Sequence, residues 1–499
     1  MTEKRNFDLT SFQRAKEKIV ALNADVWNEH KYGFHRDVNK IRDYSLEEVD
    51  KIIASSNLES HKKLSRNYFM KDGFYRRIIL HYATILTYSG LLIPNPKFGK
   101  KLSTPHIQKR YYSAMDYVDN NFTSELFVNW SIRALVDGAY YGLVTDLSKD
   151  NFVLLELPSC YCRNIFKDIN GRNIVELDVT YFNSILDEED RRQALSVYPK
   201  FIGKHYHAFK KGLVESKWVK IPTEIGFCFT LTNDARPLFL NVIPATIQYD
   251  SAVDTERERD LEEIRKIIVQ KVPHLNDGTL LFEPEEAAEM HAGAVEMMKG
   301  NKNVSILTTY TDVDSIISKT SADTVSNGIT TMKQNIYSEA GASGEIFSPS
   351  GVQAINTSIT NDAALMMILA DKYSSFITYI LNDLFSNGNI SFKYKILPIN
   401  HYQRSDYLTD ALKMAQSGYS WLLPNAAMGM SQKELINIKE LENEVLGLKE
   451  ILIPLSSSYT QSSDGGATDE GGAPEKKTEE KSEKTIMNED SINNQGGSN

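Results

Sequence analysis

Residues 319–386 read KTSADTVSNGITTMKQNIYSEA, then GASGEIFSPSG, then VQAINTSITNDAALMMILADKYSSFITYILNDLFS. This stretch predicts a helix over Lys319–Ala340, a break that begins at Gly341, and a longer helix over Ala354–Phe385. Three glycines and a proline in the break exclude a continuous helix. In the first helix, apolar residues recur at the spacing of one helical face: Val325, Ile329, Met332, Ile336 and Ala340.

The second helix is long enough to organise the rest of the chain. At 1.5 Å per residue it would extend roughly 48 Å, and a helix of that length is stable only if it is packed along most of it. Periodicity alone would suit the core helix of an α/β enzyme. The apolar positions step by three and four: Ile355, Ile359, Ala363, Met366, Ala370, Tyr373, Ile377, Ile380 and Leu384.

Toward the N-terminus the pattern is helical first and strand-like later. Residues 1–70 read as helices, and Ser45-Leu-Glu-Glu48 has the form of a capping box. Gly73-Phe-Tyr-Arg-Arg77 leads into an apolar helix that ends at Ser89-Gly90, and two more helices follow over 103–119 and 122–141. From residue 143 the period changes to that of strands, with one further helix over 184–198 and another strand near Tyr206. Residues 1–245 are therefore expected to form one large α+β domain.

A charged helix is predicted next, over Asp250–Lys271. Its charges suit either a solvated face or side-by-side packing against copies of itself. Residues 272–318 then form a small insert with an acidic helix over Glu283–Lys299 and a strand over Val304–Thr309. An insert of this size is too small to have its own core, so we expect another chain or copy to complete it.

The C-terminal part contains fewer elements. A strand is predicted over Ile390–Leu397 and a helix over Ser405–Gln416. Another helix begins with a second capping box, Ser431-Gln-Lys-Glu434. Residues 456–499 are mostly Ser, Gly, Glu, Lys, Asn and Asp, which predicts a disordered tail.

Composition narrows the functional classes. The 499 residues carry a net charge of −10, which argues against a protein that grips nucleic acid over a broad basic surface. Three cysteines suit a reducing compartment. The apolar run Ile78–Ile93 is too short and too polar for a membrane span, and no apolar segment follows Met1 to make a signal peptide.

Motifs of catalysis and metal binding are missing from the sequence. No Walker A, His-Glu-x-x-His, Gly-x-Ser-x-Gly or Cys-x-x-Cys pattern occurs. Three pairs look like partial metal sites but lack further ligands at suitable spacing. We therefore expect no enzyme activity, no cofactor and no metal. The pairs are Cys160 with Cys162, which alternation would place on one side of a strand, His205 with His207, and Asp312 with Asp314.

The order of these segments resembles the portal protein of tailed bacteriophages, of the siphovirus type, over roughly residues 40–455. Local pieces resemble that family as well, and their order carries the weight. They are Gly73-Phe-Tyr-Arg-Arg77, Ala134-Leu-Val-Asp-Gly-Ala-Tyr140, Glu256-Arg-Glu-Arg-Asp-Leu261, Gly341-Ala-Ser-Gly-Glu-Ile-Phe347 and Leu441-Glu-Asn-Glu-Val-Leu446.

The resemblance implies a portal-type α+β architecture with an α+β wing, paired stem helices, a small α/β clip, a long spine helix and a short helical crown. It assigns residues 1–245 to the wing, 246–271 to stem helix 1, 272–318 to the clip, 319–340 to stem helix 2, 341–353 to the tunnel loop, 354–386 to the spine helix, 387–400 to a wing return strand, 401–455 to the crown, and 456–499 to the disordered tail.

The function implied is a ring, a homododecamer, that forms the DNA channel at one capsid vertex for packaging, retention and ejection. Implied partners are double-stranded DNA, the terminase large subunit, the major capsid and scaffolding proteins and a head–tail adaptor, with no membrane. The implied location is the virion, and the host cytoplasm during assembly. The tunnel loop would line the channel with Gly341, Ser343, Gly344, Glu345, Ile346, Phe347, Ser348, Ser350 and Gly351.

Two other functional classes stay open at the level of sequence. One is an intracellular enzyme whose active site uses no recognisable motif, and the other is a helical adaptor scaffold. The size of the assembly in solution distinguishes both from a ring.

Overall fold

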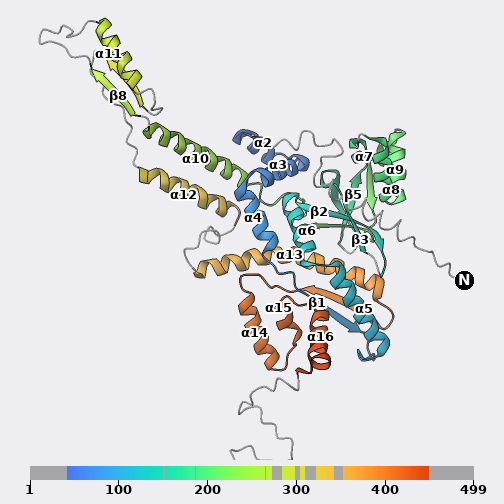
Figure 1. Cartoon of the computed structure of the whole chain (residues 1–499). Coiled ribbons are helices and arrows are strands. Elements are labelled where there is room, and N and C mark those ends of the chain that lie inside the picture. The colour runs from blue at the N-terminus through green and yellow to red at the C-terminus, as the bar shows by residue number, and fades with distance from the viewer. Residues whose placement is uncertain are drawn as a thin grey trace, which may run out of the picture. The chain divides into compact units, whose positions relative to one another are not determined.

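A computed structural model gives the fold, a mixture of helix and sheet (Figure 1). Of the residues that the structure describes, 61% are helical and 16% lie in strands. Two units divide the chain, 1–437 and 438–499. The residues described are 42–149, 152–169, 171–185, 187–264, 266–271, 284–297, 304–309, 322–341 and 352–448.

The first helices begin where their capping residues predict. Ser45 and Glu48 form the expected capping box at the start of α2, with both reciprocal hydrogen bonds present. Asp72 both ends α3 and caps α4, accepting from Tyr75 N at 2.5 Å. The helices are α2 (Leu46–Ala54), α3 (Leu58–Lys71), α4 (Gly73–Thr84), α5 (Pro105–Asn121) and α6 (Ser124–Val136).

The predicted C-terminal ends of two helices are wrong, because both helices end earlier in the structure. The apolar helix stops at Thr84, and Gly90–Pro96 forms strand β1 instead. Tyr88 has a left-handed backbone with φ 54°, which a helix cannot continue through. Likewise α6 ends at Val136, and a left-handed Gly138 leads directly into strand β2.

Two antiparallel three-stranded sheets follow, in the orders β3-β2-β7 and β4-β5-β6. The prediction of a strand near Tyr206 is wrong, because this residue lies in helix α9. Ile202 and Tyr206, four residues apart, are buried on one face of that helix. Cys160 lies in a 3-10 turn and only Cys162 begins a strand, so the two do not alternate along one strand. The elements are β2 (Ala139–Leu147), β3 (Phe152–Glu156), η1 (Ser159–Tyr161), β4 (Cys162–Lys167), β5 (Asn173–Asp178), α7 (Tyr181–Ser184), α8 (Glu188–Val197), α9 (Lys200–Lys210), η2 (Val214–Lys217), β6 (Trp218–Ile221) and β7 (Gly226–Thr230).

The sheet β3-β2-β7 separates two hydrophobic cores. Successive side chains of a strand point to opposite faces. Tyr140 and Phe229 therefore pack with Trp130 and Tyr373 on the helical side. Their neighbours Tyr141 and Cys228 face the second core, built from β4–β6 and α7–α9.

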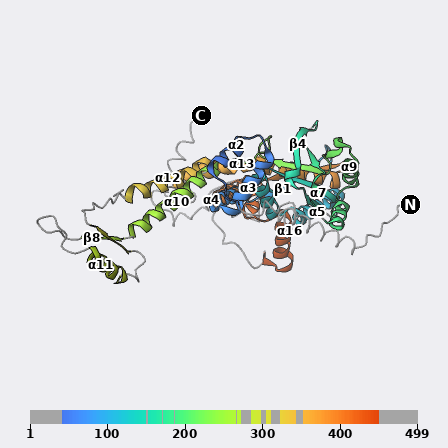
Figure 2. The ribbon, with the colours of Figure 1, turned by 90° about the horizontal axis from the view of Figure 1, so that it is seen from above.

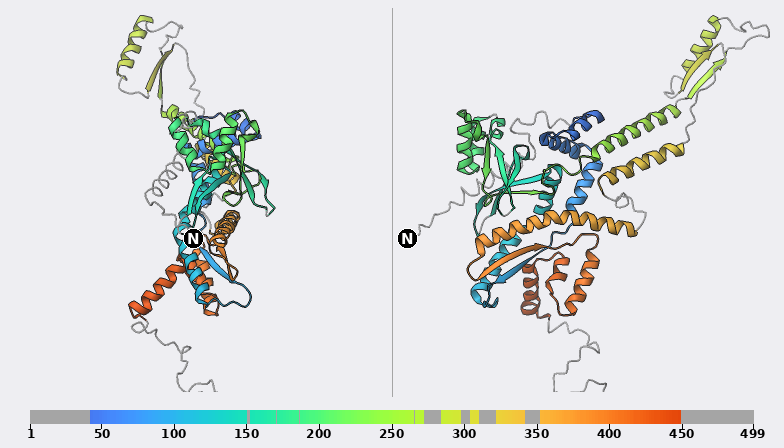
Figure 3. Two further views of the ribbon diagram at one scale, coloured as in Figure 1. Left: turned by 90° about the vertical axis from the view of Figure 1, so that its right-hand side faces the viewer. Right: turned by 180° about the vertical axis from the view of Figure 1, so that it is seen from behind.

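The long helix is confirmed as α13 (Val352–Phe385), 34 residues or about 50 Å. It lies along strand β10 (Ile390–Ile396), which pairs antiparallel with β1 (Figure 3). By length and composition α13 could also cross a membrane. One face of it is instead buried in the main core, as a core helix requires. The predicted positions that the structure shows buried are Ile359, Ala363, Met366, Ala370, Tyr373, Ile377 and Ile380.

A polar stripe on α13 covers the second edge of β10. Ser374, Thr378 and Asn382 recur every fourth residue, so they lie in one line on the helix. Their side-chain oxygens accept hydrogen bonds from the backbone N–H groups of Ile396, Tyr394 and Phe392 at 3.0, 2.9 and 2.8 Å. The helix thus takes the place of a third strand.

The charged helix differs from its prediction at both ends. Helix α10 spans Val242–Ile264, and Lys266–Lys271 forms strand β8. The reason for the strand is a β-branched run, Ile267-Ile268-Val269, which pairs in parallel with strand β9 (Val304–Thr309). The insert therefore begins before residue 272, with helix α11 (Pro284–Met297) between its two strands.

The predicted helix before the break is confirmed as α12 (Ala322–Glu339). It packs side by side with α10 (Figures 1 and 2). Its last turn, with Ile336 and Tyr337, is buried in the main core, where Phe74 of α4 contacts the rings of both Tyr337 and Tyr249. Helix α4 therefore supports both members of the pair.

The C-terminal helices are α14 (Arg404–Gln416), a short α15 (Leu422–Ala427) that the sequence did not predict, and α16 (Gln432–Glu440). Ser431 and Glu434 form the second expected capping box. The described part of the unit 438–499 holds the end of α16 and a π-helical turn, η4 (Leu441–Val445). The helices expected within 1–41 and the tail 456–499 lie outside the described residues.

A buried charge cluster joins α3, α6 and β3. Arg66 donates to both carboxylate oxygens of Asp137 at 2.6 and 2.9 Å. Nε of Arg133 lies 3.0 Å from Oε1 of Glu156. The two arginines, led by Arg66, outweigh burial and hold the pKa of Asp137 below its usual range. Burial outweighs Arg133 at Glu156 and raises the pKa of that carboxyl to about 7.

Glu156→Gln is expected to stabilise the protein only at higher pH. A carboxyl whose pKa is raised in the folded state favours folding when protonated, so its cost appears as pH rises from about 4.5 to about 7. We expect the variant to gain about 3 kcal/mol over the wild type at pH 8 and less than about 0.5 kcal/mol at pH 4.5. Urea unfolding of both proteins at the two pH values measures this, and an equal difference at both would contradict it.

Candidate functional site

The predicted channel loop is described at only one of its residues. Gly341 stands two residues after Glu339, the last residue of α12, with φ 73°, and its N–H donates to Ser338 O at 3.0 Å, as a glycine that ends a helix does. The other predicted site residues lie outside the described residues: Ser343, Gly344, Glu345, Ile346, Phe347, Ser348, Ser350 and Gly351.

The structure does describe the two segments that flank this loop, and α4 binds them together. The hydroxyl of Tyr82 lies 3.1 Å from Ala340 O, at the end of α12, and 3.0 Å from Asp362 Oδ1, in α13. Nε2 of His81 lies 3.1 Å from the other oxygen, Asp362 Oδ2. We call these four residues, His81, Tyr82, Ala340 and Asp362, the loop anchor.

All the side chains of the loop anchor are buried. Those of His81 and Asp362 are 5% and 4% exposed. The ring of Tyr82 packs on Phe239 with centroids 4.9 Å apart. Burial, together with the charge of Asp362, raises the pKa of Tyr82 far above its usual range, so its hydroxyl stays a donor. Both side chains of this His–Asp pair are buried, and Asp362 also holds the Tyr82 hydroxyl that contacts the backbone of Ala340.

Sequence reasoning missed the loop anchor, although a signal was present. Asp362 stands three residues after Ile359 and four before Met366, which places a carboxylate on the apolar face of the long helix. A charge on a buried face needs a buried partner. The adjacent pair His81-Tyr82 in an apolar helix carried the matching polar groups, but only the fold brings the two helices together.

The two partial metal pairs that lie in the described part of the chain, Cys160 with Cys162 and His205 with His207, gain no further ligands there. No group of three or more His, Cys, Asp or Glu that could hold a metal occurs there. His205 and His207 lie exposed on α9, and Asp312 with Asp314 lies outside the described residues. Burial raises the pKa of the Cys228 thiol to about 12, which keeps it unreactive at neutral pH.

The candidate site is thus the loop that begins at Gly341, together with the loop anchor that joins the two segments flanking it. Comparison of the chain with models of known protein families and with curated proteins finds no match.

Proposed function

We propose that this protein is a portal subunit, of the type found in tailed bacteriophages, and that a ring of copies forms a channel for double-stranded DNA. The observation that carries the proposal is one path of the chain. It runs out through α10, makes the small unit β8–α11–β9, returns through α12 beside α10, and enters the 34-residue α13. In a portal these segments are the stem, the clip and the spine.

The small unit supports a multi-copy assembly. Its described elements are two six-residue strands and one 14-residue helix. A unit of this size has too few residues to bury a core of its own. Neighbouring copies in a closed ring provide the missing surface, because each copy then uses the same contact with the next one.

The overall charge is compatible with DNA that passes through without being held. Each chain carries −10, so twelve copies carry −120. Negative surfaces repel phosphate, which disfavours tight, salt-sensitive binding. The proposed partners are the ones that a portal has: the terminase large subunit, the major capsid and scaffolding proteins, and a head–tail adaptor.

Native mass spectrometry of the full-length protein tests the proposal. Twelve copies of the 56.5 kDa chain give an assembly of about 680 kDa. Electron microscopy of the same sample is expected to show rings with a central channel. A protein that stays monomeric or dimeric across micromolar concentrations would rule out the ring and favour an enzyme or an adaptor scaffold.

Glu345→Lys is expected to leave ring assembly intact and to slow or block DNA packaging, most strongly at low salt. A lysine at the loop would pair with passing phosphates and add drag, and salt weakens such pairs. The measurement is nuclease-protected DNA per capsid over a range of salt concentrations. Glu215→Lys, at an exposed position in η2, is the control with the same charge change. Normal packaging by Glu345→Lys rings at every salt concentration would remove the loop from the DNA path.

A further inference from the structure

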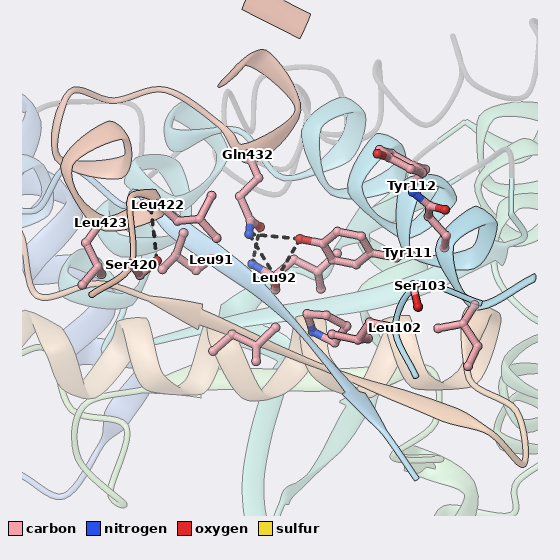
Figure 4. A pocket seen from close by; sticks show the side chains of 14 residues that line it. Leu91, Leu92, Leu102, Ser103, Tyr111, Tyr112, Ser420, Leu422, Leu423 and Gln432 are labelled. Carbon is pink, nitrogen blue, oxygen red and sulfur yellow. Dashed lines mark hydrogen bonds between the residues drawn. The ribbon is translucent and has the colours of Figure 1, made fainter. Parts of the chain in front are cut away.

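An open apolar pocket of about 610 Å³ lies between α5 and α15, with β1 crossing beneath (Figure 4). Leu422 and Leu423 stand at one end of it, and Tyr111, Tyr112 and Leu102 at the other. We call this pocket the β1 groove. Large apolar side chains at its rim are exposed to solvent, with Leu102 45% and Tyr112 40% exposed.

The free edge of β1 beside the groove is closed to a further strand. The side-chain amide of Gln432 pairs with Leu92 as a strand residue would: Oε1 accepts from Leu92 N at 2.7 Å, and Nε2 donates to Leu92 O at 3.3 Å. Every second residue of a strand has the same orientation, so Pro94 and Pro96 also face this edge, without N–H groups to donate. An occupant of the groove must therefore use side chains, not a β-ladder.

Residues 91–112, which form most of the groove, lie in a basic segment of an otherwise acidic chain. No Asp or Glu occurs between Asp72 and Asp116, and the net charge of the chain is −10. The loop from β1 to α5 carries three exposed lysines, Lys97, Lys100 and Lys101, and directly precedes Leu102 of the groove.

The start of α5 adds to this positive potential. Its first turn has no acidic residue, and the Thr104 side chain makes no capping hydrogen bond there. The positive end of the helix dipole is therefore not offset locally by a carboxylate. Lys109, exposed on the same helix, extends the basic region along α5.

We propose that the β1 groove binds an amphipathic acidic helix from another protein chain. Leucine or aromatic side chains at i, i+3, i+4 and i+7 enter the groove, and acidic side chains on the flanks pair with the lysines of the loop. The closed strand edge selects against an extended partner, and the apolar floor selects against a nucleic acid, whose backbone would bring phosphates against leucines. The proposal does not depend on the channel function.

A defined peptide tests the proposal on the full-length protein. The probe is an 18-residue fluorescein-labelled peptide with Leu and Phe at helical spacing and Glu at the other positions. A second peptide has Lys in place of every Glu, and a third has the acidic residues and Leu and Phe in scrambled order. Fluorescence anisotropy is expected to give micromolar affinity for the first peptide, weakening with salt, and at least ten-fold weaker binding for the other two.

Two variants locate the binding. Lys100→Glu with Lys101→Glu is expected to reduce the affinity at least ten-fold and to flatten the salt dependence. Leu102→Ser is expected to reduce it at least three-fold with the salt dependence unchanged. Lys200→Glu with Lys204→Glu, at exposed positions of α9, is the matched charge control and should bind normally. Thermal melts followed by circular dichroism confirm that each variant is folded.

Four results would overturn the proposal. Equal binding of the acidic and basic peptides would rule out an acidic helix as the occupant of the β1 groove. Unchanged affinity for the acidic peptide in both groove variants would rule it out as well. A change of assembly mass in Leu102→Ser assigns the groove to a second copy of this chain. Tighter binding of a 20-base-pair DNA duplex than of the acidic peptide, lost in the double lysine variant, assigns the basic loop to nucleic acid.

Discussion

Gly138→Ala is expected to lower the free energy of unfolding by about 3 to 4 kcal/mol. Gly138 connects α6 to β2 with φ 76°, a conformation that costs an L-residue about 1 kcal/mol or more. A Cβ at this position would also stand 2.1 Å from the backbone oxygen of Ala235, which has no side-chain freedom to move away. Displacing that backbone adds about 1 to 3 kcal/mol. The same turn is fixed by Thr230, whose hydroxyl donates to Gly138 O at 2.8 Å.

Gly171→Ala is the control that separates backbone strain from the clash. Gly171 has nearly the same φ, 78°, but nothing lies within 4 Å of a Cβ built there. We expect it to cost about 1 kcal/mol, from the left-handed backbone alone. Urea unfolding of both variants measures the difference, and equal losses would show that the close approach to Ala235 is relieved without cost.

Asp362→Ala is expected to cost about 3 kcal/mol, because it removes the acceptor shared by two buried donors. His81 Nε2 loses its 3.1 Å partner, and Tyr82 keeps only Ala340 O. A buried donor left without its partner costs about 1 to 3 kcal/mol. Hydrogen exchange at the end of α12 is expected to rise as well, because the Tyr82 hydroxyl that holds Ala340 is no longer positioned by the carboxylate.

Two controls make this prediction specific to the loop anchor. Asp371→Ala removes a carboxylate from an exposed position on the same helix and should change stability by less than about 0.5 kcal/mol. Tyr82→Phe combined with Asp362→Ala should cost less than the two single changes added together, because both act on one hydrogen bond. Strict additivity would show that the two side chains act independently and that the loop anchor is not one unit.

Part of the candidate site could be predicted from the sequence, and part is visible only in the structure. Gly341 was predicted from the sequence as the end of a helix, and its φ of 73° agrees. The carboxylate of Asp362 could be suspected, since it stands on an apolar face. Its partners His81 and Tyr82 lie about 280 positions away along the chain, and nothing local in the sequence pairs them. The portal assignment rests on the order of the segments and stays a proposal.

Local signals were enough wherever one helix face or one cap determined the element. The stripe from Ile355 to Leu384 predicts a helix over Ala354–Phe385, and α13 spans Val352–Phe385. Ser45 and Ser431 mark two further helix starts, because such patterns depend only on neighbours within one or two turns. Tertiary contacts determined the elements whose local preference was divided. Residues Lys266–Lys271 continue a charge pattern typical of a helix, but they form a strand because they pair with β9. The spacing of Ile202 and Tyr206 fits a helix as well as a strand, and packing in the second core determines that it is a helix.

The protection of the edges of the β1–β10 sheet also depends on tertiary contacts. In the sequence, Gln432 and the stripe Ser374–Asn382 look like ordinary polar residues. In the fold, each lies against an open strand edge and accepts hydrogen bonds from its backbone N–H groups. Without these partners the buried N–H groups would be unpaired, which costs free energy.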